Sequence, residues 1–534
     1  MPSSRRQRSR SRPRSRPRSK STPTIRFDQR SSGVLMHISS LHGPHGIGDL
    51  GPQAFAFVDF LAAARQSWWQ MLPVGPIGKG DSPYSARSAM AGEPMFISLD
   101  WLATQRLLTK RDLGSTRALQ DSRVDYKATQ QFREQLLRKS FAAFEQQMKK
   151  RPVRGFEAFC RKNRHWLDDY VMFMALRHAH GNTPWIHWPA NLRDRDPDAL
   201  KRMRRVVGRE VRYHRYLQFQ FQTQWRKLRA YAKKKKVRLI GDVPFYVEHD
   251  SADVWANREL FELNNKGAPT QIAGVPPDYF SRTGQLWGNP LFRWDAHKKD
   301  DYAWWTARLR VAFERFDAVR LDHFIGFQRA WSVRAGSNTA KGGRYVDGPA
   351  APFLESIKSQ LGALPLIAED LGVVTEEVTA LREQFALPGV RVVQFGFSDE
   401  SGQSEHLPHN YPSDCVAYTG THDNDTAIGW FTDKGKGATT RSKRTVEKER
   451  KLAMTYLGSD GKAFHWDMIR AAMMSQAGMT IIPLQDILGL GPEARMNRPA
   501  RPRGNWDWRL QGSELTDDVQ SQLALLTKIY GRAL

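Results

Sequence analysis

The sequence predicts an α/β fold: a (β/α)8 barrel of the TIM type with helical insertions in its barrel loops. Three observations lead to this prediction. The chain is long, short apolar runs of β-type composition recur along it, and helical patterns separate several of those runs. Its 534 residues, of which 40% are hydrophobic, are enough to form one large core. Strands that alternate with helices pair in parallel through right-handed crossovers. An open doubly wound sheet is the alternative, because counting strands does not distinguish the two folds.

Eight short runs have the length and composition of buried strands, and turn residues bound them. We predict strands at 33–38, 68–74, 237–247, 317–324, 364–372, 389–397, 415–423 and 480–488. The segment 51–66, after the first run, is predicted to be an amphipathic helix. Before the third run, helical spacing predicts one apolar stripe made of Leu217, Phe221, Trp225, Leu228 and Ala232.

The predicted strands are unevenly spaced, which indicates insertions. Well over a hundred residues, about 100–235, separate the second run from the third and are predicted to form a helical subdomain in a barrel loop. A second insertion, rich in aromatic residues, is predicted at about 250–310. A third, rich in lysine, is predicted at about 432–462. The barrel with these insertions is expected to span residues 25–534.

Residues 1–24 form a tail rich in Arg, Ser and Pro. The first twenty residues contain nine basic and no acidic side chains, so nine of the +27 formal charges lie there and +18 remain elsewhere. Like charges repel and there is little apolar surface to bury, so we predict a disordered tail. Three roles are open for it: a solvated segment without a specific role, contact with nucleic acid or another polyanion, and an organelle transit peptide.

Cysteine usage and hydropathy indicate the compartment. The two cysteines, Cys160 and Cys415, lie far apart in sequence, which argues against a disulfide framework and against a cysteine-based metal site. We find no apolar run long enough to span a bilayer and no apolar segment that resembles a signal peptide. We therefore expect a cytoplasmic protein without membrane contact, or an organellar one if the tail is a transit peptide. The oligomeric state is not indicated.

Carboxylates stand at or near the ends of four predicted strands: Asp242, Asp322, Glu369 and Asp423. In a (β/α)8 barrel, the C-terminal ends of the strands carry the catalytic groups. In the stretch FDAVRLDHFIGF (316–327), Arg320 precedes Asp322 by two residues, so both face the same side of the strand. The guanidinium then favours the ionised aspartate, which suits a nucleophile. The alternative is a purely structural ion pair.

Two further stretches carry acidic groups at strand ends. Glu369 in PLIAEDLG could act as a general acid if burial or a like charge raises its pKa, and the alternative is an acid stabilised by a helix dipole. The segment YTGTHDNDT (418–426) collects His422, Asp423 and Asp425. A metal site is disfavoured there because closely paired histidines are missing, and Asp425 before Thr426 also suits a helix start.

Together these groups point to chemistry on sugars. Two carboxylic acids that flank a glycosidic bond are the minimum equipment, one as nucleophile and one as proton donor. A third carboxylate can hold sugar hydroxyls and stabilise the charged transition state. Aromatic rings should line such a cleft, and Tyr84 and Trp287 lie in loop-like contexts rich in Gly and Pro. The alternative is that these rings only pack the insertions.

The chain resembles the 4-α-glucanotransferases, called amylomaltase or disproportionating enzyme, of the α-amylase clan. The resemblance runs from about residue 31 to 511. The matching stretches are GPHGIGDLG, GDSPYS, GDVPFYVEHDSADVW, GVPPDYFSRTGQLWGNP, VRLDHF, IAEDLG, YTGTHDNDT and LGLGPEARMNRP with GNWDWR. It implies a barrel with helical insertions and no cofactor. It also implies an enzyme that breaks an α-1,4 bond, holds the glucan as a covalent β-glycosyl enzyme and passes it to a sugar hydroxyl.

Carried over by motif, the resemblance makes Asp322 the nucleophile, Glu369 the acid/base and Asp423 the stabiliser of the transition state. It implies α-1,4-glucans, malto-oligosaccharides or glycogen, as partners and no metal. Positions that match substrate contacts of the family are Tyr84, Asp242, Trp287, Arg320, Asp370 and His422.

The sequence departs from the family pattern at several positions. The family usually has Arg at the position of Ile325, Gln at that of Ser85, Asn at that of Glu93, and HPTSLPGP where residues 37–44 read HISSLHGP. Because the three carboxylates are intact, we expect activity, with subsite affinity and chain-length preference altered. An α-glucan hydrolase of the same clan is the near alternative. A non-catalytic glucan- or polyanion-binding protein on the same barrel is the more distant one.

Overall fold

The computed structural model describes residues 25–534 except 115–118, 120–121, 436–439, 502 and 534. The predicted disordered tail, residues 1–24, lies outside the described residues. Among the described helices, none combines the length and the apolar character needed to cross a bilayer.

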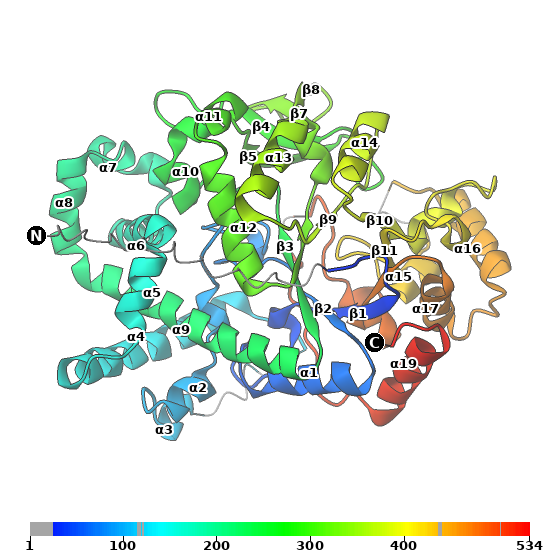
Figure 1. The fold of residues 1–534 in the computed structure, drawn as a ribbon, viewed down its shortest axis with the longest axis horizontal. Coiled ribbons are helices and arrows are strands. Elements are labelled where there is room, and N and C mark those ends of the chain that lie inside the picture. The colour runs from blue at the N-terminus through cyan, green and yellow to red at the C-terminus, as the bar shows by residue number, and fades with distance from the viewer. Residues whose placement is uncertain (1–24, 115–118, 120–121, 436–439, 502, 534) are drawn as a thin grey trace, which may run out of the picture.

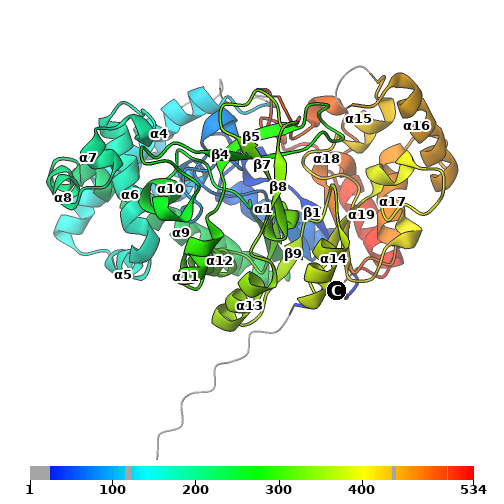
Figure 2. The same cartoon turned by 90° about the horizontal axis from the view of Figure 1, so that it is seen from above.

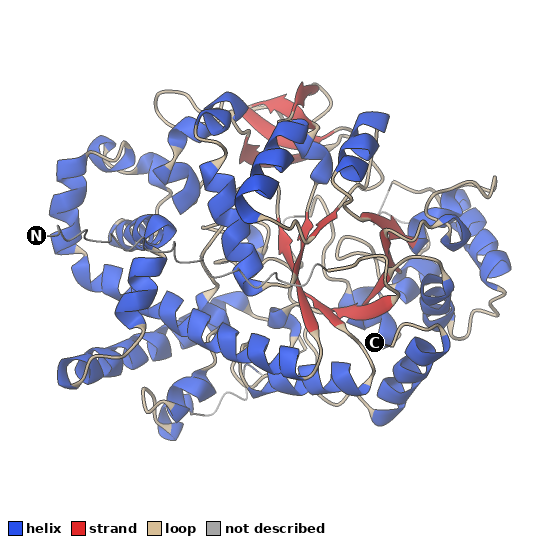
Figure 3. Ribbon diagram, viewed as in Figure 1, coloured by secondary structure: helices blue, strands red, loops and turns tan. Residues whose placement is uncertain are grey.

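Eight parallel strands form the central sheet, which confirms the predicted barrel (Figures 1 and 3). They are β1 (Ser31–Leu35), β2 (Trp68–Gln70), β3 (Arg238–Val243), β6 (Ala318–Leu321), β9 (Leu366–Ala368), β10 (Gly389–Val392), β11 (Cys415–Tyr418) and β12 (Met479–Pro483). Their order is β10-β11-β12-β1-β2-β3-β6-β9. Between the two outer strands, the Ala368 amide donates a hydrogen bond to the Pro388 carbonyl (2.9 Å), so the sheet is nearly closed.

The observed strands are shorter than the predicted runs and most end earlier. β6 ends at Leu321 and β9 at Ala368, so Asp322 and Glu369 each follow directly after a strand. The C-terminal parts of the predicted runs are therefore loops or short helical turns that follow the strands, at the end of the barrel where (β/α)8 folds keep their functional groups.

Helices cover the outside of the barrel. The predicted helix at 51–66 is confirmed as α1 (Pro52–Ala63), which begins with a proline in its first turn. The barrel is also surrounded by α9 (Gly208–Lys234), α12 (Ala303–Arg315), α13 (Ala350–Leu361), α14 (Glu376–Gln384), α17 (Phe464–Met474), α18 (Leu484–Ile487) and α19 (Asp517–Ile529).

Helix α9, whose residues fall within the predicted insertion at 100–235, connects the inserted helices to the barrel. One part of it packs on α4, α5, α6 and α8, and it also packs against α1, α12 and β3. The predicted apolar stripe is confirmed, since all five of its residues are buried. The indole of Trp225 donates a hydrogen bond to the Arg315 carbonyl at the end of α12 (3.1 Å), so even the polar atom of this buried ring is satisfied. Likewise, α12 packs on β3 and β6 and is a barrel helix within the predicted insertion at 250–310.

The remaining helices extend the molecule on two sides (Figures 1 and 2). On one side lie α2 (Leu99–Thr104), α3 (Lys110–Leu113), α4 (Tyr126–Lys150), α5 (Phe156–Lys162), α6 (Arg164–Ala179), α7 (Ala190–Arg193), α8 (Pro197–Val206), α10 (Ala252–Ala256) and α11 (Trp294–Lys299). On the opposite side lie α15 (Ala427–Thr432) and α16 (Lys443–Leu457), the second of which lies within the lysine-rich segment at 432–462.

A second sheet, which the sequence did not predict, stands beside the barrel (Figure 3). It is antiparallel, with the order β5 (Gln285–Pro290), β4 (Gln271–Val275), β7 (Arg329–Arg334) and β8 (Arg344–Asp347). The first pair belongs to the predicted insertion at 250–310, whereas β7 and β8 follow barrel strand β6. Residues from both pairs line the cleft described below.

Candidate active site

A cleft of about 1170 Å³ opens at the C-terminal ends of the barrel strands. Its walls come from the loops after the barrel strands, from the loop around residues 79–85 and from the four-stranded sheet. Its size suits an oligosaccharide rather than a single small molecule. Predicted site residues that line it are Tyr84, Trp287, Arg320, Asp322, Glu369, His422 and Asp423.

Arg320 organises the floor of this cleft. It lies buried in β6, and its Nη1 atom donates to Asp322 Oδ1 and to Asp242 Oδ2, both at 2.8 Å. Its Nη2 atom is 3.8 Å from Glu369 Oε2. The side chain of Asp322 is 25% exposed, so its carboxylate is fixed on one side and open to the cleft on the other. One guanidinium thus orients an aspartate that can attack a substrate atom.

Glu369 is held by backbone amides. Its Oε2 atom accepts a hydrogen bond from the His323 amide (2.7 Å), and its Oε1 atom accepts one from the Leu371 amide (3.0 Å). Burial raises the pKa of Glu369 to about 8; the charge of Arg320 opposes this shift and that of Asp322 adds to it. The group therefore carries a proton at neutral pH, as a general acid requires.

Asp423 stands in the loop after β11 with its side chain 38% exposed. Asn497 donates a hydrogen bond from Nδ2 to Asp423 Oδ1 (2.6 Å), and Arg495 donates to the Asp423 backbone carbonyl (2.6 Å). The His422 Nε2 atom lies 3.5 Å from the same Oδ1. We did not anticipate Asn497, although it lies in the stretch ARMNRP that matches the family; a lone amide in a loop gives no signal of its own.

Tyr84 contacts two other predicted site residues, Asp242 and His422. Its hydroxyl donates to Asp242 Oδ2 (2.9 Å) and lies 3.3 Å from His422 Nδ1, while its ring stacks on the His422 ring with centroids 4.9 Å apart. Burial lowers the pKa of His422, which favours the neutral imidazole.

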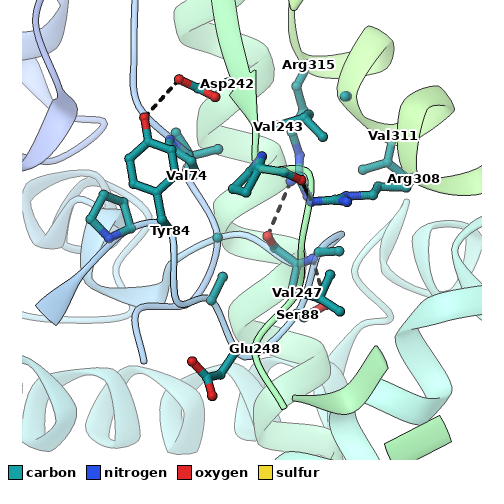
Figure 4. Close-up of a pocket in the computed structure, with 18 of the residues that line it drawn as sticks. Val74, Tyr84, Ser88, Asp242, Val243, Val247, Glu248, Arg308, Val311 and Arg315 are labelled. Carbon is teal, nitrogen blue, oxygen red and sulfur yellow. Dashed lines mark hydrogen bonds between the residues drawn. The ribbon is translucent and has the colours of Figure 1, made fainter. Parts of the chain in front are cut away.

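Asp242 lies behind the cleft rather than in its wall. Its buried carboxylate accepts a hydrogen bond from the Tyr84 hydroxyl, and both residues line a smaller cavity of about 50 Å³ (Figure 4). It bonds to Arg320 and Tyr84, which both line the cleft, so we expect it to position these two side chains, and the substrate contact that the resemblance implies stays a prediction.

Asp370, which the resemblance places among the substrate contacts, does not line the cleft. Glu369 and Asp370 follow directly after β9, and only the first of them lines the cleft. The buried Asp370 accepts a hydrogen bond from the Val390 amide (2.7 Å) and lies 3.4 Å from Arg391 Nη1 and 3.5 Å from Arg382 Nε. Its carboxylate joins β9 to β10 and does not reach the cleft, contrary to the substrate contact expected of it.

Trp287 extends into the cleft from β5 and is 37% exposed. Its ring meets the His323 ring edge to face, with centroids 4.9 Å apart and an interplanar angle of 87°. Tyr246 lies on another side, with ring centroids 6.0 Å apart. The indole is thus held by neighbouring rings while part of its surface is open, as a surface on which a sugar ring packs should be.

Of the departures from the family pattern, Ile325 and Ser85 line the cleft and Glu93 does not. Ile325 lies in a 3-10 turn (Phe324–Phe327), where it is nearly buried but lines the cleft, and Ser85 lines the cleft beside Tyr84. Glu93 lies outside the cleft wall. Its buried carboxylate accepts hydrogen bonds from the amides of Ile77 (2.6 Å) and Met95 (2.8 Å), and so closes the base of the loop that carries Tyr84.

Glu93→Gln is expected to destabilise the fold, because an amide offers one acceptor oxygen to two backbone N–H groups. The cost should be about 1–3 kcal/mol. Burial raises the pKa of Glu93 from 4.5 to about 7, against the opposing charges of Arg133 and Arg87. The folded chain therefore binds this proton more tightly than the unfolded chain, and the associated stability is present below pH 4.5 and is lost as the pH rises to about 7.

Thermal unfolding of both proteins at pH 5 and pH 7.5 measures this effect. The melting temperature of the wild type should exceed that of the variant by more at pH 5 than at pH 7.5. Glu157→Gln, at an exposed position of α5, is the matched control and should change neither value. An equal difference at both pH values would contradict the assignment.

Within the described part of the chain, no group of three or more His, Cys, Asp or Glu side chains could hold a metal ion. What the cleft does contain is an aspartate fixed by Arg320, a glutamate with a raised pKa beside the same guanidinium, a third carboxylate and open aromatic surface. This set can cleave a glycosidic bond with retention, by nucleophilic attack and proton donation.

Known proteins are similar to this chain in sequence and in fold. The family model described as 4-alpha-glucanotransferase matches residues 36–516. The 4-alpha-glucanotransferase of Synechocystis sp. is 43% identical over 511 residues, which cover 95% of this chain and 99% of the relative. That of Thermus thermophilus is 42% identical over 512 residues, with 94% and 99% covered.

A solved structure agrees with these matches. The amylomaltase from Streptococcus agalactiae in complex with acarbose has a TM-score of 0.90 and 36% identity, and the match covers 95% of this chain and all of that one. The family match spans the cleft and its three carboxylates, so the chain belongs to the 4-alpha-glucanotransferase family.

Proposed function

We propose that the chain is a 4-α-glucanotransferase that moves α-1,4-glucan segments between malto-oligosaccharides or glycogen by double displacement. The observation that carries this proposal is the pair Asp322 and Glu369: both carboxyl groups lie against the Arg320 guanidinium, Asp322 is open to the cleft, and burial raises the pKa of Glu369 to about 8. An ionised carboxylate that is open to the cleft suits a nucleophile, and a buried protonated one suits an acid.

In the first step, an Asp322 carboxylate oxygen forms a bond to the anomeric carbon while the glycosidic C–O bond breaks. Glu369 gives its proton to the departing sugar oxygen. In the second step, the ionised Glu369 takes a proton from the hydroxyl of an acceptor sugar, whose oxygen displaces Asp322 from the same carbon. Asp423, oriented by Asn497, is proposed to hold sugar hydroxyls and stabilise the positive charge that develops on the ring.

Incubation with maltotriose alone tests this function. A transferase yields a ladder of longer oligomers together with glucose and maltose, whereas a hydrolase yields only shorter sugars. The outcome depends on how well the acceptor side binds sugar and excludes water. The absence of any oligomer longer than maltotriose would favour the hydrolase, and the absence of any product would favour a non-catalytic binding protein.

We propose a cytoplasmic location, because both cysteines are free thiols, as a reducing compartment favours. An organelle is the alternative if the basic tail is a transit peptide. For the tail, the composition of residues 1–24 supports contact with a polyanion such as nucleic acid.

Deletion of residues 1–24 is expected to leave transfer activity and melting temperature almost unchanged, because these residues precede the family match at 36–516. If the tail binds a polyanion, the full-length chain should retain RNA or DNA more strongly than the truncated chain, with a steep salt dependence. Filter binding at several salt concentrations measures this. Equal retention by the two forms would eliminate the polyanion role, and a large loss of melting temperature would mean that the tail docks on the barrel.

A further inference from the structure

One wall of the cleft is formed by a face of the four-stranded sheet, which is separate from the barrel sheet whose loops carry the three carboxylates. Four residues pair in register across all four strands: Leu286 with Gly274, Gly274 with Trp331, and Trp331 with Tyr345. Directly paired residues share a face of a sheet. Leu286, Trp331 and Tyr345 all line the cleft, so this row presents two aromatic rings next to an aliphatic side chain.

The Trp331 ring is fixed before any ligand arrives. Its indole N–H donates a hydrogen bond to the Ala340 carbonyl (2.9 Å). The backbone of Gly343 lies against the ring so closely that a Cβ there would come within 2.3 Å of Nε1. Because the polar atom is satisfied and the ring cannot turn, little conformational entropy is lost when a ligand packs on it.

Tyr345 completes the surface. Its ring meets that of Trp331 with centroids 4.9 Å apart at 73°, and the residue is 38% exposed, which is rare among the large apolar side chains of the described chain. The guanidinium of Arg329 lies 4.1 Å from the centroid of the Tyr345 ring and donates to the Val373 carbonyl (3.1 Å). Arg329 thereby ties the sheet to the loop after β9, which also lines the cleft.

We propose that Trp331 and Tyr345 form an additional binding subsite for the α-1,4-glucan chain, remote from the bond that is cleaved. The inference rests on the proposed function for its ligand class. The surface is aromatic and lies within the same cleft as Asp322 and Glu369, so a chain held at the carboxylates can continue onto it. The apolar CH faces of glucose pack on such rings, and the neighbouring Arg329 can donate hydrogen bonds to sugar hydroxyls.

A remote subsite makes binding depend on chain length. Only a glucan long enough to reach the sheet gains from the two rings, whereas a short one is held at the carboxylates alone. Removal of Tyr345 should therefore weaken the binding of long chains more than that of short ones. The expected loss in affinity for maltoheptaose is roughly ten-fold, as for the removal of one stacking ring.

The experiment measures Kd by calorimetry for maltotriose and maltoheptaose, in an Asp322→Asn background that prevents turnover. Tyr345→Ala should lower the preference for maltoheptaose about ten-fold. Tyr345→Phe, which keeps the ring, should preserve the preference. Tyr530→Ala, at a half-buried tyrosine next to α19 and outside the cleft, is the matched control and should not change it.

An unchanged preference in folded Tyr345→Ala, or an equal loss for both sugars, would overturn the subsite. Trp331→Leu gives a second test of the same surface, with melting temperature as the check on folding. Because binding is read without turnover, these outcomes are separate from the maltotriose assay. A chain that binds maltoheptaose through Tyr345 but transfers nothing would refute the proposed reaction and leave the subsite standing.

Discussion

Asp322→Asn is expected to lower turnover of maltotriose by at least about 10⁴-fold while the fold is retained. An amide has nearly the shape of the carboxylate but is a poor nucleophile, so the glycosyl enzyme does not form. Arg320 keeps its ion pair with Asp242 in the variant, and this limits the structural cost. The measurements are initial rates with maltotriose, circular dichroism and melting temperature.

The matched control is Asp295→Asn, which removes an exposed aspartate of α11 and should keep full activity. Mass spectrometry must show that the Asp322→Asn preparation contains neither wild-type enzyme nor deamidated protein. Near-normal rates in such a preparation would rule out Asp322 as the nucleophile.

Glu369→Gln should slow transfer between natural sugars by about 10²–10⁴-fold, the usual contribution of a general acid or base. Formation of the glycosyl enzyme from a maltosyl fluoride should be far less affected, because fluoride departs without a proton. Pre-steady-state release of fluoride measures the first step, and initial rates with maltotriose measure the complete cycle. A defect that the fluoride donor does not relieve, in folded protein, would argue against the acid role.

The pH dependence of the wild type gives a second view of the same group. Since burial raises the pKa of Glu369 to about 8, the acid form predominates below that pH. The specificity constant for maltotriose should fall as the pH rises through about 8, and fluoride release should not fall with it. The raised pKa thus extends the active range toward neutral pH, which an ordinary glutamate could not do.

The barrel was predictable because its signals are local. Each strand is a short apolar run, and apolar residues at helical spacing indicate the buried face of α9. The boundary between the predicted insertion and the barrel is not visible in the sequence for a physical reason: α9, a helix of 27 residues, packs both on the inserted helix α6 and on the barrel elements α1 and β3. Two of the three carboxylates, Asp322 and Glu369, could be found because each follows a strand immediately, and Asp423 lies in the loop after β11.

The four-stranded sheet was missed because its pairing is not local. β4 pairs with β7, although α11, α12 and barrel strand β6 lie between them in sequence. No periodicity along the chain indicates such a pairing, and the cleft-lining roles of Trp331 and Tyr345 depend on it. Asn497 was missed for a related reason, since only the fold brings it to within 2.6 Å of Asp423.

The join between β9 and β10 has a consequence for how variants of this enzyme are interpreted. Two hydrogen bonds connect β9 to β10 and so nearly close the barrel. The Ala368 amide donates to the Pro388 carbonyl, and the Val390 amide in β10 donates to the Asp370 carboxylate. Glu369, the proposed proton donor, therefore lies between the two residues that connect β9 to β10. A substitution at Asp370 would weaken the connection between β9 and β10 next to Glu369. We expect the Glu369 carboxyl to shift relative to the sugar as a result. A kinetic defect in such a variant would report a displaced proton donor, and it would be no sign that Asp370 touches the glucan.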